Sequence, residues 1–237
     1  TVALWCYGAA NILPVNPTIF DGGNATGARA INVHLPWSNG SVYWDCGGGN
    51  GNYDRIEKPA DPAMYEGQWN HWAFTKNTTT GTMKIFLNGT LWHSGTGKTI
   101  PIDFQSLYLG GSADHSLSYF GLIDEFQVWD KELDESTIAA WMRKTVTPDH
   151  PDYAHLRAYY TFNDGTGNHA ADSSPAHASA AIHLPNWIPT RGEHLYKNFS
   201  TANIRPNTTF LQGDLITSDQ TTEVLDSVLN PQNQVLH

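Results

Sequence analysis

The stretch QWNHWAFTKNTTTGTMKIFLNGT, residues 68–90, contains two strand-like runs and two turn signals. Trp69, Trp72 and Phe74 are large apolar residues in the first run, which must cover one face of a sheet. Trp72 and Phe74 are two residues apart, so they lie on the same face of a strand, and we expect Trp72 in the core. Asn88-Gly89 can supply the two positive-φ residues of a type I′ hairpin turn. The stretch therefore predicts a pair of antiparallel strands.

Short β-like runs also occupy most of the chain on either side. They cover residues 1–8, 28–35, 41–46, 90–95, 106–111, 121–130 and 156–162. Turn signals such as Asn39-Gly40, Thr80-Gly81 and Gly110-Gly111 separate them. Strands at this regular spacing are typical of an antiparallel sandwich or barrel.

One short helix is expected near residues 134–144. Asp134 can act as its N-cap, Ile138, Trp141 and Met142 share one face, and Pro148 ends it. From residue 191 to residue 237 the pattern becomes irregular apart from one strand-like run at 208–215. We therefore expect a sandwich domain over residues 1–190, followed by a tail or the start of a further domain.

Composition limits the partners of the protein. The 237 residues carry a net charge of −10, and only 15% of them are charged. An acidic surface repels nucleic acid and anionic membranes, and the chain has no apolar run long enough to span a bilayer. The neutral polar surface suits a secreted all-β protein, and the strand-like opening suggests a piece of a larger one.

The two cysteines allow two arrangements. Cys6 and Cys46 each lie in an aromatic strand-like run. They could form one disulfide in an oxidising compartment, or remain two separate thiols.

Several blocks of the chain resemble the laminin-G-like, concanavalin-A-like jelly-roll superfamily, in its bacterial multi-domain secreted form. The blocks are Gln68–Phe74, Met83–Leu91, Leu107–Gly110, Gly121–Trp129 and Leu133–Trp141, in the usual order and spacing. The resemblance covers roughly residues 1–145. It implies an all-β jelly roll with N-terminal strands missing before Thr1, while residues 156–190 close this sandwich or lead into something else.

The resemblance also implies a structural calcium ion. In such sandwiches an Asp-Ser loop and the Ile-Asp-Glu strand often bind Ca²⁺ at one edge; Asp172 and Asp124 match this pattern, with Asp164 and Asn163 as weaker candidates. The alternative is that Asp124 and Asp172 only accept hydrogen bonds from nearby backbone amides.

An active site is not expected, although the superfamily includes glycoside hydrolases. Retaining glycosidases need two carboxylates about 5–5.5 Å apart. Asp124 and Glu125 are the nearest match, but adjacent residues on a regular strand point to opposite faces. No catalytic serine motif or phosphate-binding loop is present in the sequence.

The stretch HLPWSNGSVYWDCGGGNGNYDRI, residues 34–56, is the candidate ligand-binding region. An aromatic ring can cover the apolar face of a sugar while polar groups bind its hydroxyls. The candidate residues are Trp37, Asp45, Asn52, Tyr53, Asp54 and Arg55. Alternatively, Arg55 only pairs with Asp54 or Asp45, the glycine run only shapes a loop, and the stretch is architecture.

The sequence therefore predicts a non-catalytic module of a secreted or cell-surface protein that binds a glycan or another cell-surface polymer. The alternative is a structural or adhesion module that packs against neighbouring domains and binds no small ligand.

Overall fold

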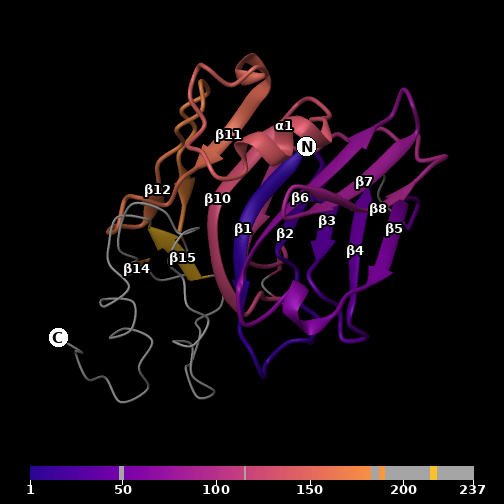
Figure 1. Cartoon of the computed structure of the whole chain (residues 1–237), viewed down its shortest axis with the longest axis horizontal. Helices are drawn as coiled ribbons and strands as arrows, with labels where there is room; N and C mark the ends of the chain where they lie inside the picture. Colours follow the sequence, from indigo (N-terminus) through magenta and orange to yellow (C-terminus); the bar gives the residue numbers. More distant parts are fainter. Residues whose placement is uncertain (48–50, 115, 183–186, 190–213, 218–237) are drawn as a thin grey trace.

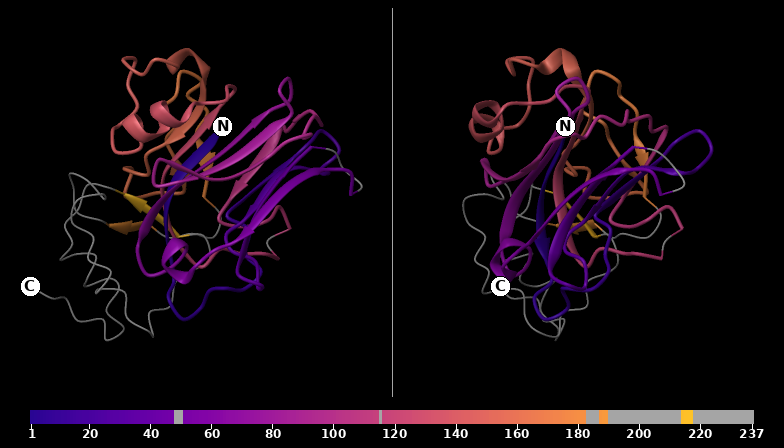
Figure 2. Two further views of the ribbon diagram at one scale, coloured as in Figure 1. Left: turned by 45° about the vertical axis from the view of Figure 1, so that its right-hand side comes forward. Right: turned by 90° about the vertical axis from the view of Figure 1, so that its right-hand side faces the viewer.

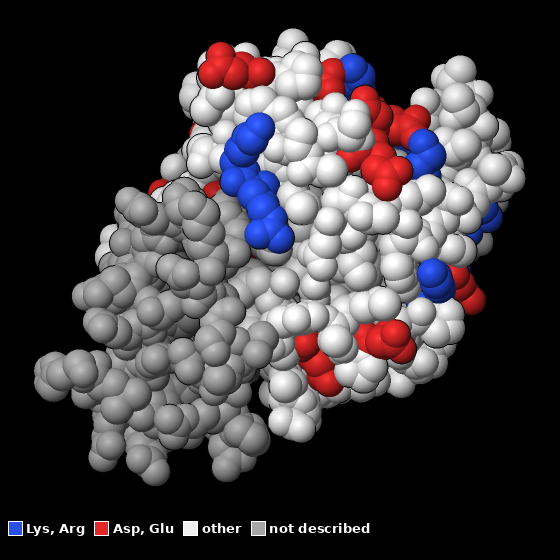
Figure 3. Space-filling model, viewed as in Figure 1, with Lys and Arg blue, Asp and Glu red and all other residues white. Residues whose placement is uncertain are grey.

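In the part of the chain that the structure describes, the protein is an all-β sandwich with one short α-helix, as a computed structural model shows (Figure 1). The structure describes residues 1–47, 51–114, 116–182, 187–189 and 214–217. The expected fold class is confirmed. On the side seen in Figure 3, uncharged residues cover most of the described surface, in keeping with the low charge content.

Two sheets form the sandwich. The larger has the order β14-β15-β10-β1-β6-β7-β8, and β11 also pairs with β10. Its strands are β1 (Val2–Gly8), β6 (Trp69–Asn77), β7 (Thr82–Leu87), β8 (Thr90–Gly95), β10 (Gly121–Trp129), β11 (Leu156–Tyr160), β14 (Trp187–Pro189) and β15 (Asp214–Thr217).

The smaller sheet has the order β5-β4-β3-β2-β9. Its strands are β2 (Phe20–Gly23), β3 (Arg29–His34), β4 (Ser41–Cys46), β5 (Asp54–Pro59) and β9 (Ser106–Leu109). A separate two-stranded sheet joins β12 (His169–Ala170) to β13 (Ala180–Ala181), and two 3₁₀ turns occupy η1 (Pro62–Met64) and η2 (Tyr153–His155).

The two sheets form two layers (Figure 2), and the residues of the main core come from both of them. Trp72 is fully buried there and stacks on Phe74, with ring centroids 6.1 Å apart. Phe20 and Trp44 of the smaller sheet also pack against Phe74, with ring centroids 5.8 and 5.7 Å from that of Phe74. The predicted core position of Trp72 is confirmed.

The hairpin between β7 and β8 has the predicted turn. Asn88 and Gly89 have φ angles of 51° and 82°, as a type I′ turn requires. Asn88 Oδ1 also accepts a hydrogen bond from the His71 backbone amide, so this turn is tied to β6.

The helix α1 (Glu135–Trp141) begins where the sequence predicts. The side chain of Asp134 accepts a hydrogen bond from the Thr137 amide at 2.7 Å, which caps the first turn. Ile138 packs with Phe86, Trp129 and Leu133 on the outer face of the larger sheet. The helix thus covers a second, smaller core.

The chain after the helix returns to the sandwich. β11 pairs antiparallel with β10, from Phe126 opposite Tyr160 to Trp129 opposite Leu156. The segment at 156–160 therefore adds a strand to the first sandwich. Of the strand-like run predicted at 208–215, residues 208–213 lie outside the described residues, and β15 pairs parallel with β10.

Cys6 and Cys46 do not form the disulfide that the sequence allowed. Both are free and buried in the main core, Cys6 on β1 and Cys46 on β4. Burial raises the pKa of Cys6 to about 12 and the pKa of Cys46 well above its usual value. Both thiols therefore stay protonated at neutral pH.

Candidate ligand-binding face

A row of side chains crosses the outer face of the smaller sheet. Cross-strand pairing aligns Tyr108, Asp21, Asn32, Asp45 and Arg55, one from each strand in the order β9-β2-β3-β4-β5. The adjacent row contains Leu109, Phe20, Val33, Trp44 and Ile56, which all contribute to the main core. Because side chains alternate between faces, the first row must face outward. We call it the polar row.

Arg55 is held in place from three sides. Its Nε and Nη2 donate to the two carboxylate oxygens of Asp45, at 2.6 and 2.7 Å. Its guanidinium carbon lies 4.8 Å from the centre of the Tyr43 ring and 4.9 Å from that of Tyr53. The hydrogen bonds with Asp45 raise the pKa of Arg55, so it stays charged. A bidentate ion pair and two cation–π contacts therefore order this side chain before any ligand arrives.

Further aromatic side chains continue from Tyr43. Asn39 Nδ2 donates to the Tyr43 hydroxyl at 2.7 Å. The ring centroids of His34 and Trp37 lie 4.3 Å apart, and those of His34 and Tyr43 lie 6.1 Å apart. Burial is the main cause that lowers the pKa of His34, so the imidazole is neutral at pH 7. We call Tyr43, Tyr53, Arg55 and Trp37 the aromatic platform.

The other half of the polar row has a second arginine. Arg29 Nε lies 3.5 Å from Asp21 Oδ1, and the Ala113 amide donates to Asp21 Oδ2. Asn32 is fully buried between Asp21 and Asp45, and its Oδ1 has no hydrogen-bond partner in the structure. The carboxylates of Asp21 and Asp45 thus lie beneath Arg29 and Arg55, whose side chains are more exposed.

The structure brings together four of the six predicted ligand-binding residues. Asp45, Arg55, Tyr53 and Trp37 lie on this face. Asn52 is exposed in the segment that leads into β5.

Asp54 does not join this face. It points into the sandwich, where its Oδ2 accepts hydrogen bonds from Lys76 Nζ at 2.6 Å and from the Ile100 amide at 2.8 Å. The alternation along β5 places Arg55 outside and Asp54 inside. Arg55 therefore pairs with Asp45, not with Asp54.

The glycine run after β4 allows a close approach at Gly47. It has a φ of 83°, and an added Cβ would lie 2.3 Å from a methyl group of Ile100. Gly48 and Gly49 lie outside the described residues.

Tyr43, His34, Asp21, Asn32 and Arg29 were not among the predicted site residues. Alternation within residues 28–35 and 41–46 would have grouped Asn32 with His34 and Tyr43 with Asp45. Nothing local to residue 21 shows that it aligns with them, because β2 reaches this position by pairing with β3 and β9.

The predicted calcium ligands are separately engaged in hydrogen bonds. Asp172 accepts four, from the amides of Tyr159, Ser174 and Ala178 and from the Ser174 hydroxyl. Asp164 accepts from the Ala171 amide. Asp124 accepts from the Glu125 amide, while its Oδ2 has no partner. No cluster of three or more His, Cys, Asp or Glu side chains suited to a metal ion occurs in the part of the chain that the structure describes.

This geometry fits a calcium ion poorly at Asp172, because its carboxylate already accepts as many hydrogen bonds as it has lone pairs. Calcium binding through Asp124, Asp172 and Asp164 stays a prediction. Asn163 lies beside Asp164 in the loop after β11.

Asp124 and Glu125 interact, although a regular strand would separate them. A β-bulge shifts the pairing of β10 with β1 between Ala3 and Trp5, and Glu125 has a φ of 51°. Burial, with repulsion from Glu125 added, raises the pKa of Asp124 well above its usual value. Burial raises the pKa of Glu125 to about 7. The expectation of opposite faces was wrong because the bulge interrupts the alternation.

Comparison with known families decides the classification. Residues 1–139, more than half of the chain, match the family model described as "Concanavalin A-like lectin/glucanases superfamily". The chain belongs to this superfamily. The resemblance to this superfamily is thereby confirmed.

Two proteins that are similar to this chain share less than a third of their aligned residues with it. The rat (Rattus norvegicus) "Sushi, von Willebrand factor type A, EGF and pentraxin domain-containing protein 1" is 28% identical over an alignment of 140 residues, and the match covers 54% of this chain and 4% of that protein. A solved structure from Bacteroides ovatus, designated a "putative carbohydrate binding protein", has a TM-score of 0.52 at 17% identity and covers 78% of this chain and 54% of its own. The chain thus spans only part of each, and the structural likeness shows the fold.

Proposed function

We propose that this protein is a non-catalytic carbohydrate-binding module that binds its glycan on the aromatic platform. The observation that carries the proposal is the placement of Arg55 between the rings of Tyr43 and Tyr53 while it is paired with Asp45. An exposed ring can cover the C–H face of a sugar, and the guanidinium edge can donate to its hydroxyls. Both kinds of group are side by side here, on the outside of a sheet.

The platform is also ordered in advance. Arg55 and Tyr43 come from two paired strands, and their neighbours restrict both side chains. A ligand therefore has little side-chain entropy to remove on binding, which favours affinity. Sites on strands are also held more precisely than sites on loops.

The burial of Asp124 and Glu125 supports a binding role rather than glycoside hydrolysis. Asp124 is fully buried and Glu125 is almost so, on the side of the larger sheet that carries α1. A sugar could not reach these carboxyls without a rearrangement. The aromatic platform has no comparable pair of free carboxylates, because Arg55 neutralises Asp45.

The comparisons agree with this proposal. The superfamily includes lectins, and the Bacteroides ovatus protein is designated as carbohydrate binding. We propose that the module acts outside the cell, in a secreted or surface protein of bacterial type, with a glycan or surface polymer and neighbouring domains as partners. Among the described residues, no helix has the length and apolarity needed to cross a membrane; the acidic charge disfavours nucleic acid.

A glycan array with the native protein tests the proposal, followed by titration calorimetry on any glycan that binds. We expect Tyr53→Ala to weaken binding at least roughly tenfold and Tyr53→Phe to bind like the native protein, because the ring face makes the contact. Leu91→Ala, at an exposed position on β8 of the other sheet, is the matched control. Absence of any glycan ligand would favour the structural or adhesion module instead, whereas native affinity in Tyr53→Ala would show that the glycan does not bind on the aromatic platform.

A further inference from the structure

We infer that the ligand is an extended, uncharged glycan chain that lies across the smaller sheet from Tyr53 to Tyr108, rather than a single terminal sugar. This inference rests on the proposed function and adds the class of ligand. It depends on three features of the outer face: its exposed ends, its arginines and its charge.

The two exposed ends lie on opposite edges of the sheet. Tyr53 immediately precedes β5 and Tyr108 lies on β9, and these are the two edge strands. Each residue is 37% exposed. Among the described residues only Leu91 is a further exposed large apolar side chain, so two of the three lie on this face. Four strand spacings separate β5 from β9, about 19 Å in total, which is far longer than one sugar ring.

Two arginines lie between these ends, and each forms an ion pair with a carboxylate of the polar row. The Arg55 side chain is 34% exposed and the Arg29 side chain 39%, while those of Asp45 and Asp21 are 1% and 11% exposed. Arg55 uses only Nε and one Nη2 hydrogen in its bonds with Asp45, which leaves other N–H groups available. A chain that crosses the sheet would therefore meet donors over both halves of the row.

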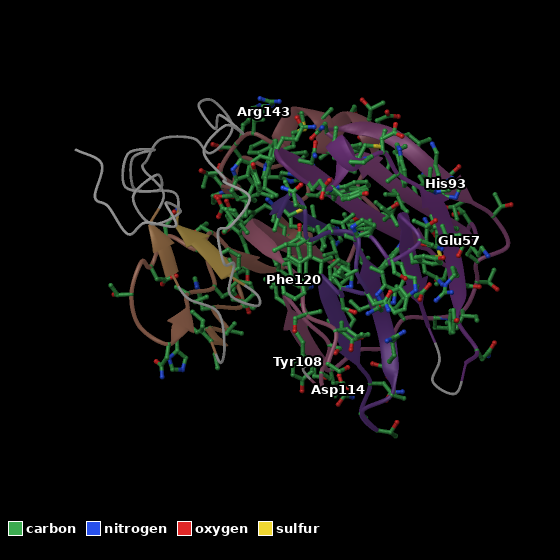
Figure 4. All side chains as sticks on the ribbon, turned by 90° about the horizontal axis from the view of Figure 1, so that it is seen from below. Glu57, His93, Tyr108, Asp114, Phe120 and Arg143 are labelled. Carbon is green, nitrogen blue, oxygen red and sulfur yellow. The ribbon has the colours of Figure 1, made fainter. Side chains whose placement is uncertain are left out.

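The charges on this face favour an uncharged chain. Asp45 and Asp21 offset Arg55 and Arg29 one for one. Among the described residues, one further carboxylate lies near each end: Glu57 is exposed on β5 opposite Tyr43 of β4, and Asp114 is exposed in the loop whose Ala113 amide bonds Asp21. Figure 4 shows Tyr108 and Asp114 at one end of the described molecule and Glu57 at another. A uronic or sialic acid would approach these carboxylates at an energetic cost.

A chain-length series tests this inference. The native protein is titrated with unbranched, uncharged oligosaccharides of the bound glycan, from the disaccharide to the hexasaccharide, and with a hexasaccharide that carries a uronic acid. We expect affinity to rise roughly tenfold along the series, because a second aromatic contact is added at Tyr108. Tyr108→Ala should remove this gain and leave disaccharide binding unchanged.

Two controls separate the outcomes. Tyr53→Ala should weaken the binding of every length, and Tyr108→Phe should retain the gain. Equal affinity for all lengths, native behaviour of Tyr108→Ala, or tighter binding of the uronic acid chain would overturn this inference while leaving the proposed function in place. If the proposed function itself were wrong, Tyr53→Ala would bind the oligosaccharides of every length with native affinity.

Discussion

The ammonium group of Lys76 lies 2.6 Å from a carboxylate oxygen of Asp54, inside the sandwich. The Lys76 side chain is 1% exposed and that of Asp54 is 10% exposed, so the two groups are buried together as an ion pair. This pair explains why Asp54 contributes to the fold, although its neighbours Tyr53 and Arg55 belong to the platform.

Removing Asp54 should destabilise the protein strongly. Asp54→Ala leaves Lys76 buried without its partner, and we expect a loss of about 3–5 kcal/mol in the free energy of unfolding. Urea denaturation measures it. The double variant Asp54→Ala/Lys76→Met should recover part of the loss, because no buried charge remains; equal stability of the single variant and the native protein would contradict this role.

Glu125 should make stability depend on pH. Its pKa in the folded protein is about 7, above the ordinary 4.5, because burial penalises the carboxylate. The folded state therefore binds this proton more tightly than the unfolded state. The resulting stability is present below about pH 4.5 and is lost as the pH rises through about 7. Asp124 shifts in the same direction.

Glu125→Gln tests this dependence. Its stability relative to the native protein should increase between pH 5 and pH 8, roughly the range of the shift, as followed by urea denaturation at a series of pH values. Glu57→Gln, the same substitution at an exposed site on β5, is the matched control. A pH-independent difference for Glu125→Gln would refute the assignment.

Trp72→Ala should cost about 3–5 kcal/mol of stability, since it empties a fully buried position between Phe74 and Trp92. Trp72→Phe should lose less, because it keeps one ring and removes an indole N–H that has no partner in the structure. Thermal denaturation of both variants gives the comparison. A native melting temperature in Trp72→Ala would disprove the core assignment.

Cys6 and Cys46 should react with a thiol reagent only after unfolding. Both are buried, and their raised pKa values keep the reactive thiolate scarce. We expect two reactive thiols per chain in denaturant and almost none in the native protein. A reductant should leave the melting temperature unchanged; a lower value would indicate a disulfide.

Calcium should raise the melting temperature if the predicted site exists, and chelator should lower it, because an ion bound to the folded state stabilises it by mass action. Asp124→Asn should abolish the response. Asp172→Asn is a poor reporter, since Asp172 accepts four hydrogen bonds that the substitution would disturb in any case. An identical melting curve in excess chelator would show that the predicted calcium site does not stabilise the protein.

Much of this protein follows from its sequence alone. The period-two placement of Trp72 and Phe74 determined a shared strand face, Asn88-Gly89 determined a hairpin, and Asp134 determined the start of the helix. These features depend on residues close together in the chain, where steric preference and alternation suffice. The turn signal Asn39-Gly40 likewise predicted a turn, and it lies between the paired strands β3 and β4.

Only the tertiary structure decided which residues meet on the outer face of the smaller sheet. Asp21 and Tyr108 join Asp45 and Arg55 through pairing between strands far apart in the chain, and the same register turns Asp54 inward toward Lys76. Likewise, the bulge at Glu125 exists only relative to β1. Alternation tells which residues of one strand share a face, but the choice of face and of neighbours depends on cross-strand register, which burial of the whole core selects.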